Sequence, residues 1–101
     1  MKVLFICNQN LNRSKTAENL FSKKFDTKSA GLYNERPVNE NQISWADVIV
    51  VMEDEQRNEI AKRFPKQYIK KRIVSLDVED NYFYNQPQLI RILKDKMSKL
   101  F

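Results

Sequence analysis

Four short apolar runs alternate along this chain with segments of helical periodicity, and this alternation leaves few folds open. Residues 3–6 and 48–52 are continuous runs of aliphatic, β-branched and aromatic side chains, a pattern typical of strands buried on both faces of a parallel sheet. Residues 73–76 form a weaker third run. Residues 27–30, which Gly31 follows, form a short fourth run. The sequence therefore predicts four strands.

Helical periods lie between and after these runs. One begins near residue 14, a second ends at Pro65, and a third begins near Pro87, where a proline suits the first helical turn. We expect residues 32–46 to form a loop with one helical turn at about residues 41–46. The apolar faces of the three periods are Ala17, Leu20, Phe21 and Phe25, then Ile60, Ala61 and Phe64, then Ile90, Leu93, Met97 and Leu100.

Strands that alternate with helices imply right-handed crossovers, and hence a four-stranded parallel sheet with helices on both faces. A chain of 101 residues is long enough for one hydrophobic core and too short for two, and no linker rich in glycine, proline or serine divides it. We therefore expect one α/β domain over residues 1–101. Ligands of such sheets bind at the carboxyl ends of the strands, here the loops after Ile6, Met52 and Leu76.

The composition excludes several kinds of catalytic and metal site. The chain has no histidine, and Cys7 is its one cysteine, which excludes a Ser-His-Asp triad, an internal disulfide, and any zinc site built on histidine or several cysteines. We expect no metal and no cofactor. The net charge of +5 suits an anionic partner such as a phosphate ester. The basic run 66–72 contains only one aromatic residue, Tyr68, so nucleic acid is not an expected partner.

The lengths of the same apolar runs indicate where in the cell the protein is expected. The longest of them spans about five residues, far below the roughly 20 that a membrane span requires. The run that follows Met1 and Lys2 also stops at Asn8, before it reaches the length of an export signal. We expect a cytoplasmic protein without a membrane partner, in a compartment where a lone thiol stays reduced.

The loop after the first predicted strand carries a thiol and, six positions later, an arginine at the start of a helix. The intervening residues are enough to curl the backbone around one phosphate, with N–H groups and the helix N-terminus facing the anion. Arg13 could then bind two phosphate oxygens, and the same field favours a nucleophilic thiolate at Cys7. A cysteine at the end of an apolar strand is also often only a small buried hydrophobe. The loop consists of Cys7, Asn8, Gln9, Asn10, Leu11, Asn12, Arg13 and Ser14.

The segment after residues 73–76 offers the carboxyl groups of Asp77, Glu79 and Asp80 at the same edge of the sheet. A phosphate monoester needs a proton on its leaving oxygen, and a cysteinyl phosphate needs a base that activates water; one carboxyl group can do both. Tyr82 and Phe83 follow these acids, and with Leu11 they could enclose the ring of an aryl phosphate. The alternative is a solvated acidic turn whose aromatic side chains pack over a helix.

Further motifs accompany the two loops. They are Val3-Leu4-Phe5-Ile6-Cys7 with Asn10, Arg13-Ser14, Ala17-Glu18 and Phe21, then Ser29-Ala30-Gly31, then Val51-Met52-Glu53, then Glu79-Asp80-Asn81-Tyr82-Phe83. Together they resemble the low-molecular-weight protein tyrosine phosphatases, over most of the chain. Members of that family are longer, so the resemblance is to a compact, shortened relative that lacks length between Gly31 and Asp47.

The resemblance implies roles for single residues. Cys7 would attack phosphorus, Arg13 would hold the phosphoryl oxygens, and Asp80 would be the general acid, with Asp77 as its substitute. The substrate would be a phosphotyrosine protein or a small aryl phosphate, bound by residues 8–12.

Five further residues have an expected role or conformation. Asn10 would support the loop backbone at a positive φ, and Ser14 would assist the thiolate. Tyr82 and Phe83 would form an aromatic wall of the pocket. For Gly31 we expect a turn with positive φ.

The chain departs from the family at Asn12, where many members carry a second cysteine, and at Asn81, which replaces a proline after the acid. Three other functions stay open. An arsenate reductase on the same scaffold would need further cysteines when coupled to thioredoxin. A phosphocysteine carrier subunit of the sugar phosphotransferase B type generally lacks the arginine. An inactive phosphopeptide-binding module would not need all of Cys7, Arg13 and Asp80.

Overall fold

The structure, a computed structural model, describes residues 1–101. Its strands are β1 (Lys2–Cys7), β2 (Asp26–Gly31), β3 (Val48–Val51) and β4 (Arg72–Ser75), and its helices are α1 (Arg13–Leu20), α2 (Glu40–Trp45), α3 (Asp54–Arg63), α4 (Pro65–Lys70) and α5 (Pro87–Ser98). Neighbouring strands are parallel throughout, in the order β2-β1-β3-β4. The predicted class and the four-stranded parallel sheet are confirmed. No helix combines the length and the apolar character that a bilayer crossing requires.

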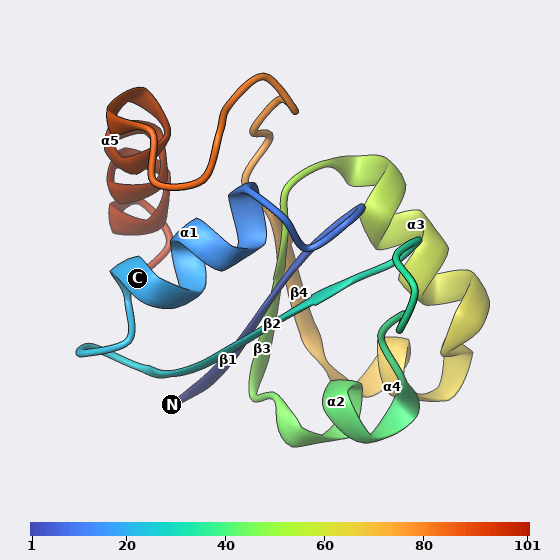
Figure 1. Ribbon diagram of the computed structural model, residues 1–101. Helices are drawn as coiled ribbons and strands as arrows, with labels where there is room; N and C mark the ends of the chain where they lie inside the picture. The colour runs from blue at the N-terminus through green and yellow to red at the C-terminus, as the bar shows by residue number, and fades with distance from the viewer.

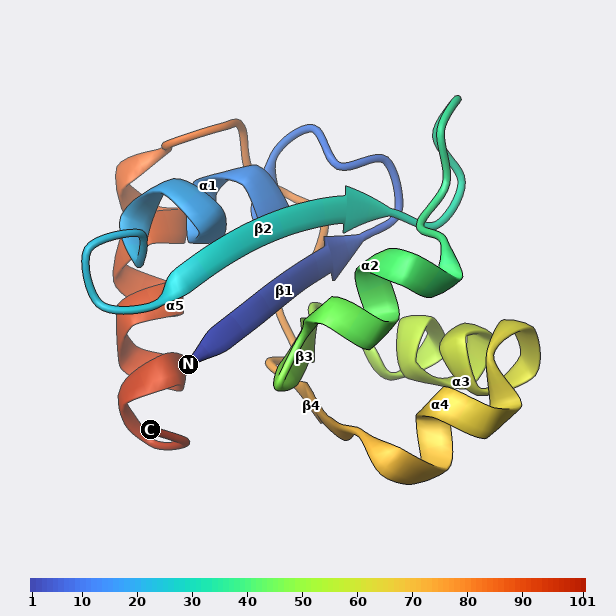
Figure 2. The same cartoon turned by 90° about the horizontal axis from the view of Figure 1, so that it is seen from below.

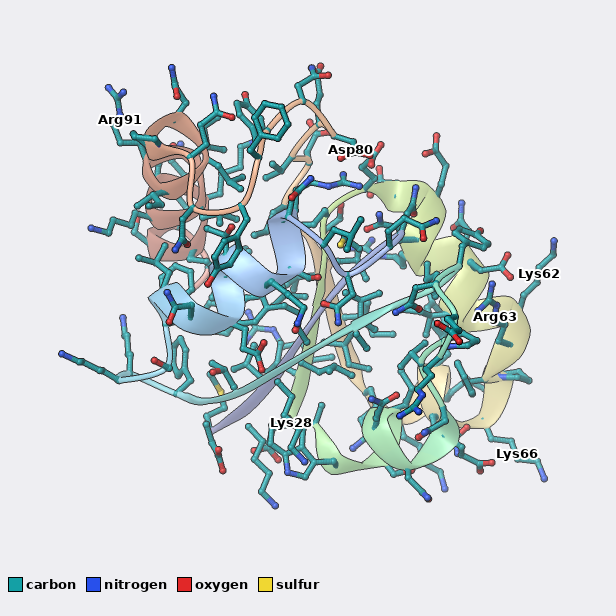
Figure 3. All side chains as sticks on the ribbon, in the orientation of Figure 1. Lys28, Lys62, Arg63, Lys66, Asp80 and Arg91 are labelled. Carbon is teal, nitrogen blue, oxygen red and sulfur yellow. The ribbon has the colours of Figure 1, made fainter.

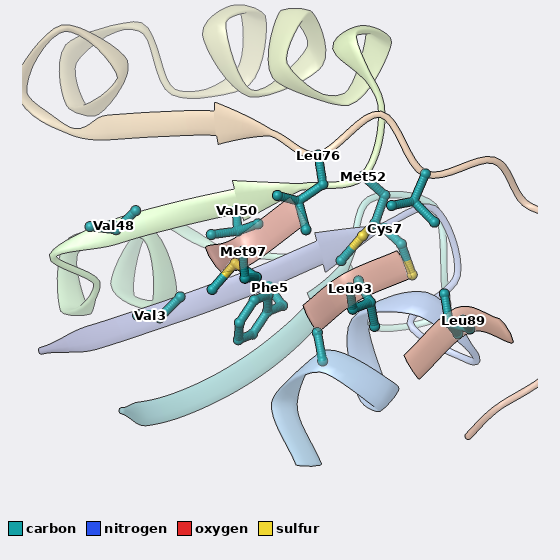
Figure 4. Packing of buried hydrophobic residues seen from close by; sticks show 12 residues of the cluster. Val3, Phe5, Cys7, Val48, Val50, Met52, Leu76, Leu89, Leu93 and Met97 are labelled. Atoms are coloured by element: carbon teal, nitrogen blue, oxygen red, sulfur yellow. The ribbon is translucent and has the colours of Figure 1, made fainter. Parts of the chain in front are cut away.

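Helices cover both faces of the sheet, as predicted. α1 and α5 lie on one face, and α2, α3 and α4 lie on the other (Figures 1 and 2). Side chains alternate along a strand, so β1 and β3 supply both cores. Val3 and Phe5 of β1 join the core under α1 and α5, which Figure 4 shows from close by, whereas Leu4 and Ile6 join the core under α2 and α3. This double burial explains why both apolar runs are continuous.

Three helical predictions need correction. α1 ends at Leu20, so Phe25 lies beyond the helix on whose apolar face it was expected. In α5 the fully buried positions are Leu89 and Leu93, followed by Met97, whereas Ile90 is only half-buried. The buried face therefore starts one residue before the predicted one. Pro65 ends α3, as predicted, but it also begins α4, because a residue without an N–H group fits the first turn of a helix.

The strand order places a crevice next to Cys7. From β1 the chain runs to β2 at one edge of the sheet and then returns past β1 to β3. The helices that follow β1 and β3 therefore cover opposite faces, and the carboxyl ends of these two strands diverge, which is where ligands of such sheets bind. Cys7 is the last residue of β1, and Glu53 lies two residues beyond the end of β3.

The expectation for Gly31 is wrong. Gly31 ends β2, and no glycine of the chain has a positive φ. A Cβ atom at this position would lie 2.7 Å from Asn34 Oδ1 and 3.0 Å from the carbonyl oxygen of Asn8. A glycine is therefore required because β2 lies close to the loop after β1, and not because the chain turns at this position.

Candidate active site

Residues 7–14, here called the cysteine loop, connect β1 to α1. The backbone N–H groups of residues 8–12 donate to no backbone acceptor. Helix α1 begins at Arg13 without a side-chain cap on its free N–H groups. Unpaired donors next to a helix N-terminus attract an anion, which is what the sequence pattern predicts for this loop.

A chain of three side chains supports the thiol. The sulfur of Cys7 lies 3.0 Å from Ser14 Oγ, which in turn donates to Asn10 Oδ1 at 2.7 Å. Cys7 and Ser14 are buried. Asn10 has a φ of 56°, the left-handed conformation expected for it. With the hydroxyl hydrogen turned from Asn10 to sulfur, Ser14 would donate to a thiolate.

Arg13 joins the cysteine loop to the loops that follow β3 and β4. Its side chain is only 2% exposed. The Nη1 atom donates to Glu53 Oε1 and, at 2.8 Å, to the carbonyl oxygen of Val78. The Nε atom lies 3.7 Å from Asp80 Oδ1. A buried guanidinium requires such partners, and here they come from the loops after Met52 and Leu76.

Cys7, Arg13 and Asp80 meet at one small cavity of about 70 Å³. Ordinary ligand pockets measure roughly 300–1,000 Å³, so this smaller cavity suits a phosphoryl-sized anion. Asp80 is 63% exposed and stands at the rim, above the start of α1 in Figure 3. Its predicted substitute, Asp77, does not line the cavity. The full lining is Cys7, Gln9, Leu11, Asn12, Arg13 and Asp80.

Solved structures share the fold over nearly the whole chain. The low-molecular-weight protein tyrosine phosphatase from T. tengcongensis superposes with a TM-score of 0.78 at 20% identity, covering 100% of this chain and 99% of that one. The chain has the fold of the low-molecular-weight protein tyrosine phosphatases. The resemblance stated from the sequence is thereby confirmed at the level of the fold.

Two further solved structures have the same fold. The YwlE arginine phosphatase from Geobacillus stearothermophilus has a TM-score of 0.76 at 20% identity, over 98% of this chain and 86% of that one. Vibrio vulnificus Wzb in complex with benzylphosphonate has a TM-score of 0.78 at 18% identity, over 98% of this chain and 95% of that one. No family model and no curated protein matches the chain.

The aromatic wall that the phosphatase resemblance implied is not found at the cavity. Tyr82 packs against the core between the sheet and α5, where burial of its ring is favourable. Phe83 is 79% exposed, and neither residue lines the cavity. This packing of Tyr82 corresponds to the alternative considered for the acidic turn. Of the apolar side chains expected around a substrate ring, only Leu11 lies at the cavity.

The other predicted loop residues divide into two groups. Gln9 and Asn12 line the cavity with Leu11. Asn10 and Ser14 stand behind the thiol, in the hydrogen-bonded chain described above. The side chain of Asn8 also points elsewhere, because its Oδ1 accepts from Gln56 Nε2 at 3.0 Å.

Sequence reasoning missed two residues that follow β3, namely Glu53 in the loop and Gln56 in the first turn of α3. Gln56 is 2% exposed, and its Oε1 accepts from the N–H groups of Met52 and Glu53 at 2.8 and 3.1 Å, while its Nε2 holds Asn8. Glu53 is the carboxylate partner of Arg13. Two signals pointed to this loop: its place after a predicted strand, and the Glu53-x-x-Gln56 spacing, which resembles a capping box.

Proposed function

We propose that this chain is a phosphomonoester hydrolase that acts through a cysteinyl-phosphate intermediate, with phosphotyrosine in proteins or a small aryl phosphate as its substrate. The observation that carries the proposal is the meeting of Cys7, Arg13 and Asp80 at one cavity. The phosphatase fold and the unpaired N–H groups of residues 8–12 support it.

In the first step the thiolate of Cys7 attacks phosphorus. The S–P bond forms while the bond from phosphorus to the leaving oxygen breaks, and protonated Asp80 gives its proton to that oxygen. Arg13 and the N–H groups of the cysteine loop bind the equatorial phosphoryl oxygens, where negative charge is spread in the transition state. The alcohol or phenol leaves, and Cys7 carries the phosphoryl group.

In the second step water attacks the cysteinyl phosphate. The carboxylate of Asp80, now deprotonated, takes a proton from the water molecule while the oxygen of the water bonds to phosphorus. The S–P bond breaks, inorganic phosphate is released, and the hydroxyl group of Ser14 donates a hydrogen bond to the departing thiolate. No electrons are exchanged. Because Cys7 has no second cysteine to shield it from oxidation, the activity suits a reducing compartment such as the cytoplasm.

Phosphoarginine is a second candidate substrate. The cavity lining contains no aromatic ring that could hold a phenol, whereas the carboxylate of Asp80 at the rim could pair with a guanidinium. One of the similar folds is an arginine phosphatase. A peptide pair that differs only in phosphotyrosine or phosphoarginine separates the two candidates by the ratio of kcat/KM.

The test is steady-state hydrolysis of 4-nitrophenyl phosphate by the wild type and matched variants. We expect no turnover in Cys7→Ser, and at least a 100-fold loss of kcat/KM on phenyl phosphate in Asp80→Asn. Asp77→Asn is the matched control, because asparagine tolerates the positive φ of 56° at that position. Turnover that persists in Cys7→Ser would overturn the mechanism.

The remaining functions give different results in the same assay. A carrier subunit would retain the phosphoryl group on Cys7 until a protein acceptor is added, and water would not release it. An arsenate reductase would consume a thiol reductant when arsenate is supplied. A binding module would bind a phosphopeptide without any release of phosphate.

A further inference from the structure

The hydroxyl group of Thr16 connects two loops that flank the cavity. Thr16 lies in α1 and is fully buried. Its Oγ1 donates to the carbonyl oxygen of Asn12, in the cysteine loop, at 2.7 Å. The same oxygen accepts from the N–H group of Asn85 at 2.9 Å. Asn85 belongs to residues 77–86, here called the acidic loop, which also carries Asp80.

The hydrogen bond from Thr16 to Asn12 is of a common kind, whereas the one from Asn85 to Thr16 is not. A threonine in a helix often donates to the carbonyl group four residues earlier, as Thr16 does to Asn12. Asn85, in contrast, lies 69 positions further along the chain. It has a φ of 57°, a left-handed conformation that needs support from its surroundings.

Beyond Asp80 the ring of Tyr82 packs against the core, but the acidic loop has few hydrogen bonds to the rest of the protein. Its first residues are fixed by the bond from Val78 N–H to the carbonyl oxygen of Met52 at 2.7 Å, and by Arg13. In residues 79–86, every hydrogen bond except that of Asn85 stays within the stretch or runs into α5. Thr16 therefore supplies the hydrogen bond that ties the later half of the loop to the scaffold of the cysteine loop.

Asp80 depends on such attachments because it does not fix its own position. Its side chain is 63% exposed, and its ion pair with Arg13 is long, at 3.7 Å. A general acid must lie within hydrogen-bond reach of the leaving oxygen, and a misplacement of about 1 Å can cost up to about 100-fold in rate. The thiol has separate supports in Ser14 and Asn10, neither of which bonds to Thr16.

We propose that Thr16 is a positioning residue that holds the acidic loop in register with the cysteine loop, so that Asp80 reaches the leaving group of a substrate bound over Cys7. This inference rests on the proposed function and adds a residue to it. Thr16 would act on proton delivery to the leaving group and would not affect the nucleophile Cys7.

The experiment compares Thr16→Val with Thr16→Ser. Valine keeps the shape of the side chain and removes the hydroxyl group, while serine keeps the hydroxyl group and removes one methyl group. Values of kcat/KM are measured on 4-nitrophenyl phosphate, whose leaving group needs little protonation, and on phenyl phosphate, whose leaving group needs a proton. Thermal unfolding of each variant reports whether it is folded.

We expect Thr16→Val to lose about 10-fold in kcat/KM on phenyl phosphate and less than about 3-fold on 4-nitrophenyl phosphate. Thr16→Ser should stay within about 3-fold of the wild type on both. An equal loss on the two substrates, or no loss on either, would overturn the proposal, because a merely structural residue would not change their ratio. A wild type that hydrolyses neither substrate would instead overturn the proposed function.

Hydrogen exchange at the amide of Asn85 tests the bridge without any turnover. The exchange rate should rise at least about 10-fold in Thr16→Val and stay near the wild-type value in Thr16→Ser, since only the first variant removes the acceptor. Unchanged exchange in a folded Thr16→Val protein would show that Thr16 does not hold the acidic loop.

Discussion

The hydroxyl oxygen of Ser14 lies 3.0 Å from the sulfur of Cys7, and both side chains are buried. Water therefore cannot replace this contact when the sulfur carries a negative charge, and Ser14 is the side-chain donor within reach of the thiolate. A hydrogen bond to a charged group contributes about 1.5–3 kcal/mol, which corresponds to roughly 10- to 100-fold in rate.

Ser14→Ala should therefore lower kcat on aryl phosphates by about 10-fold or more, with a smaller effect on KM, because the bond strengthens when the thiolate is the leaving group. Steady-state kinetics with 4-nitrophenyl phosphate measure both constants. Ser22→Ala is the control, since Ser22 is exposed and donates only to the nearby carbonyl group of Asn19. A kcat of Ser14→Ala within about 2-fold of the wild type would contradict the role of Ser14.

The left-handed backbone at Asn10 allows a test that separates the side chain from the conformation. Asn10→Gly and Asn10→Ala both remove the acceptor of Ser14, but only glycine adopts a φ of 56° without cost. We expect Asn10→Ala to have a free energy of unfolding about 1 kcal/mol below that of Asn10→Gly, the reverse of their order in ordinary loops. Urea denaturation measures the difference. Equal stabilities would mean that the loop does not hold this conformation.

Gly31 should be sensitive to the addition of a single methyl group. A Cβ atom would lie 2.7 Å from Asn34 Oδ1 and 3.0 Å from the carbonyl oxygen of Asn8, so Gly31→Ala forces β2 and the cysteine loop apart. We expect a loss of about 1–3 kcal/mol in the free energy of unfolding, together with reduced phosphatase activity. Chemical denaturation and the aryl phosphate assay report the two effects.

The companion variant Asn34→Ala identifies which contact matters in Gly31→Ala. It removes the nearer of the two obstacles and leaves the backbone of Asn8 in place. The double variant should therefore regain part of the lost stability, and the double-mutant cycle should show a coupling of at least about 0.5 kcal/mol. Strict additivity would indicate that the side chain of Asn34 moves aside freely.

The sequence predicted well those features that depend on neighbouring residues. The continuous runs of β1 and β3 are apolar because both faces of these strands are covered, and this pattern is visible without knowledge of the partners. The cysteine loop is likewise contiguous in sequence, so its thiol, arginine and helix start could be recognised together. Helix α4 could not be found in this way, because it buries no residue and its Ile69 is 84% exposed.

Contacts between loops required the strand order. Glu53 and Arg13 are 40 positions apart, and only the strand order, which places β3 beside β1 on the side opposite β2, brings them together. The bond between Thr16 and Asn85 likewise depends on how α5 returns across the face that α1 covers. The position of Tyr82 was predicted wrongly for a related reason: a core that takes up its ring is not visible in a local motif.

The positive charge of Arg13 has one close carboxylate partner. The guanidinium is almost fully buried, and Glu53 is its close carboxylate, whereas Asp80 lies 3.7 Å away and is mostly exposed. Glu53→Gln keeps the size of the side chain and leaves a buried cation without its nearest counter-charge. The free energy of unfolding should fall by about 1–3 kcal/mol, as measured in urea. Glu55→Gln, an exposed acid in the first turn of α3, should change it by no more than about 1 kcal/mol.

Inorganic phosphate should restore part of the stability lost in Glu53→Gln. A phosphate ion bound in the cavity brings negative charge to Arg13, and in the variant it no longer competes with Glu53 for Nη1. Because a ligand that binds only the folded state stabilises it, the rise in Tm at a fixed phosphate concentration should be larger in Glu53→Gln than in the wild type or in Glu55→Gln. A smaller rise in Glu53→Gln would mean that Glu53 holds Arg13 in the orientation that binds phosphate, and does not compete with the anion for it.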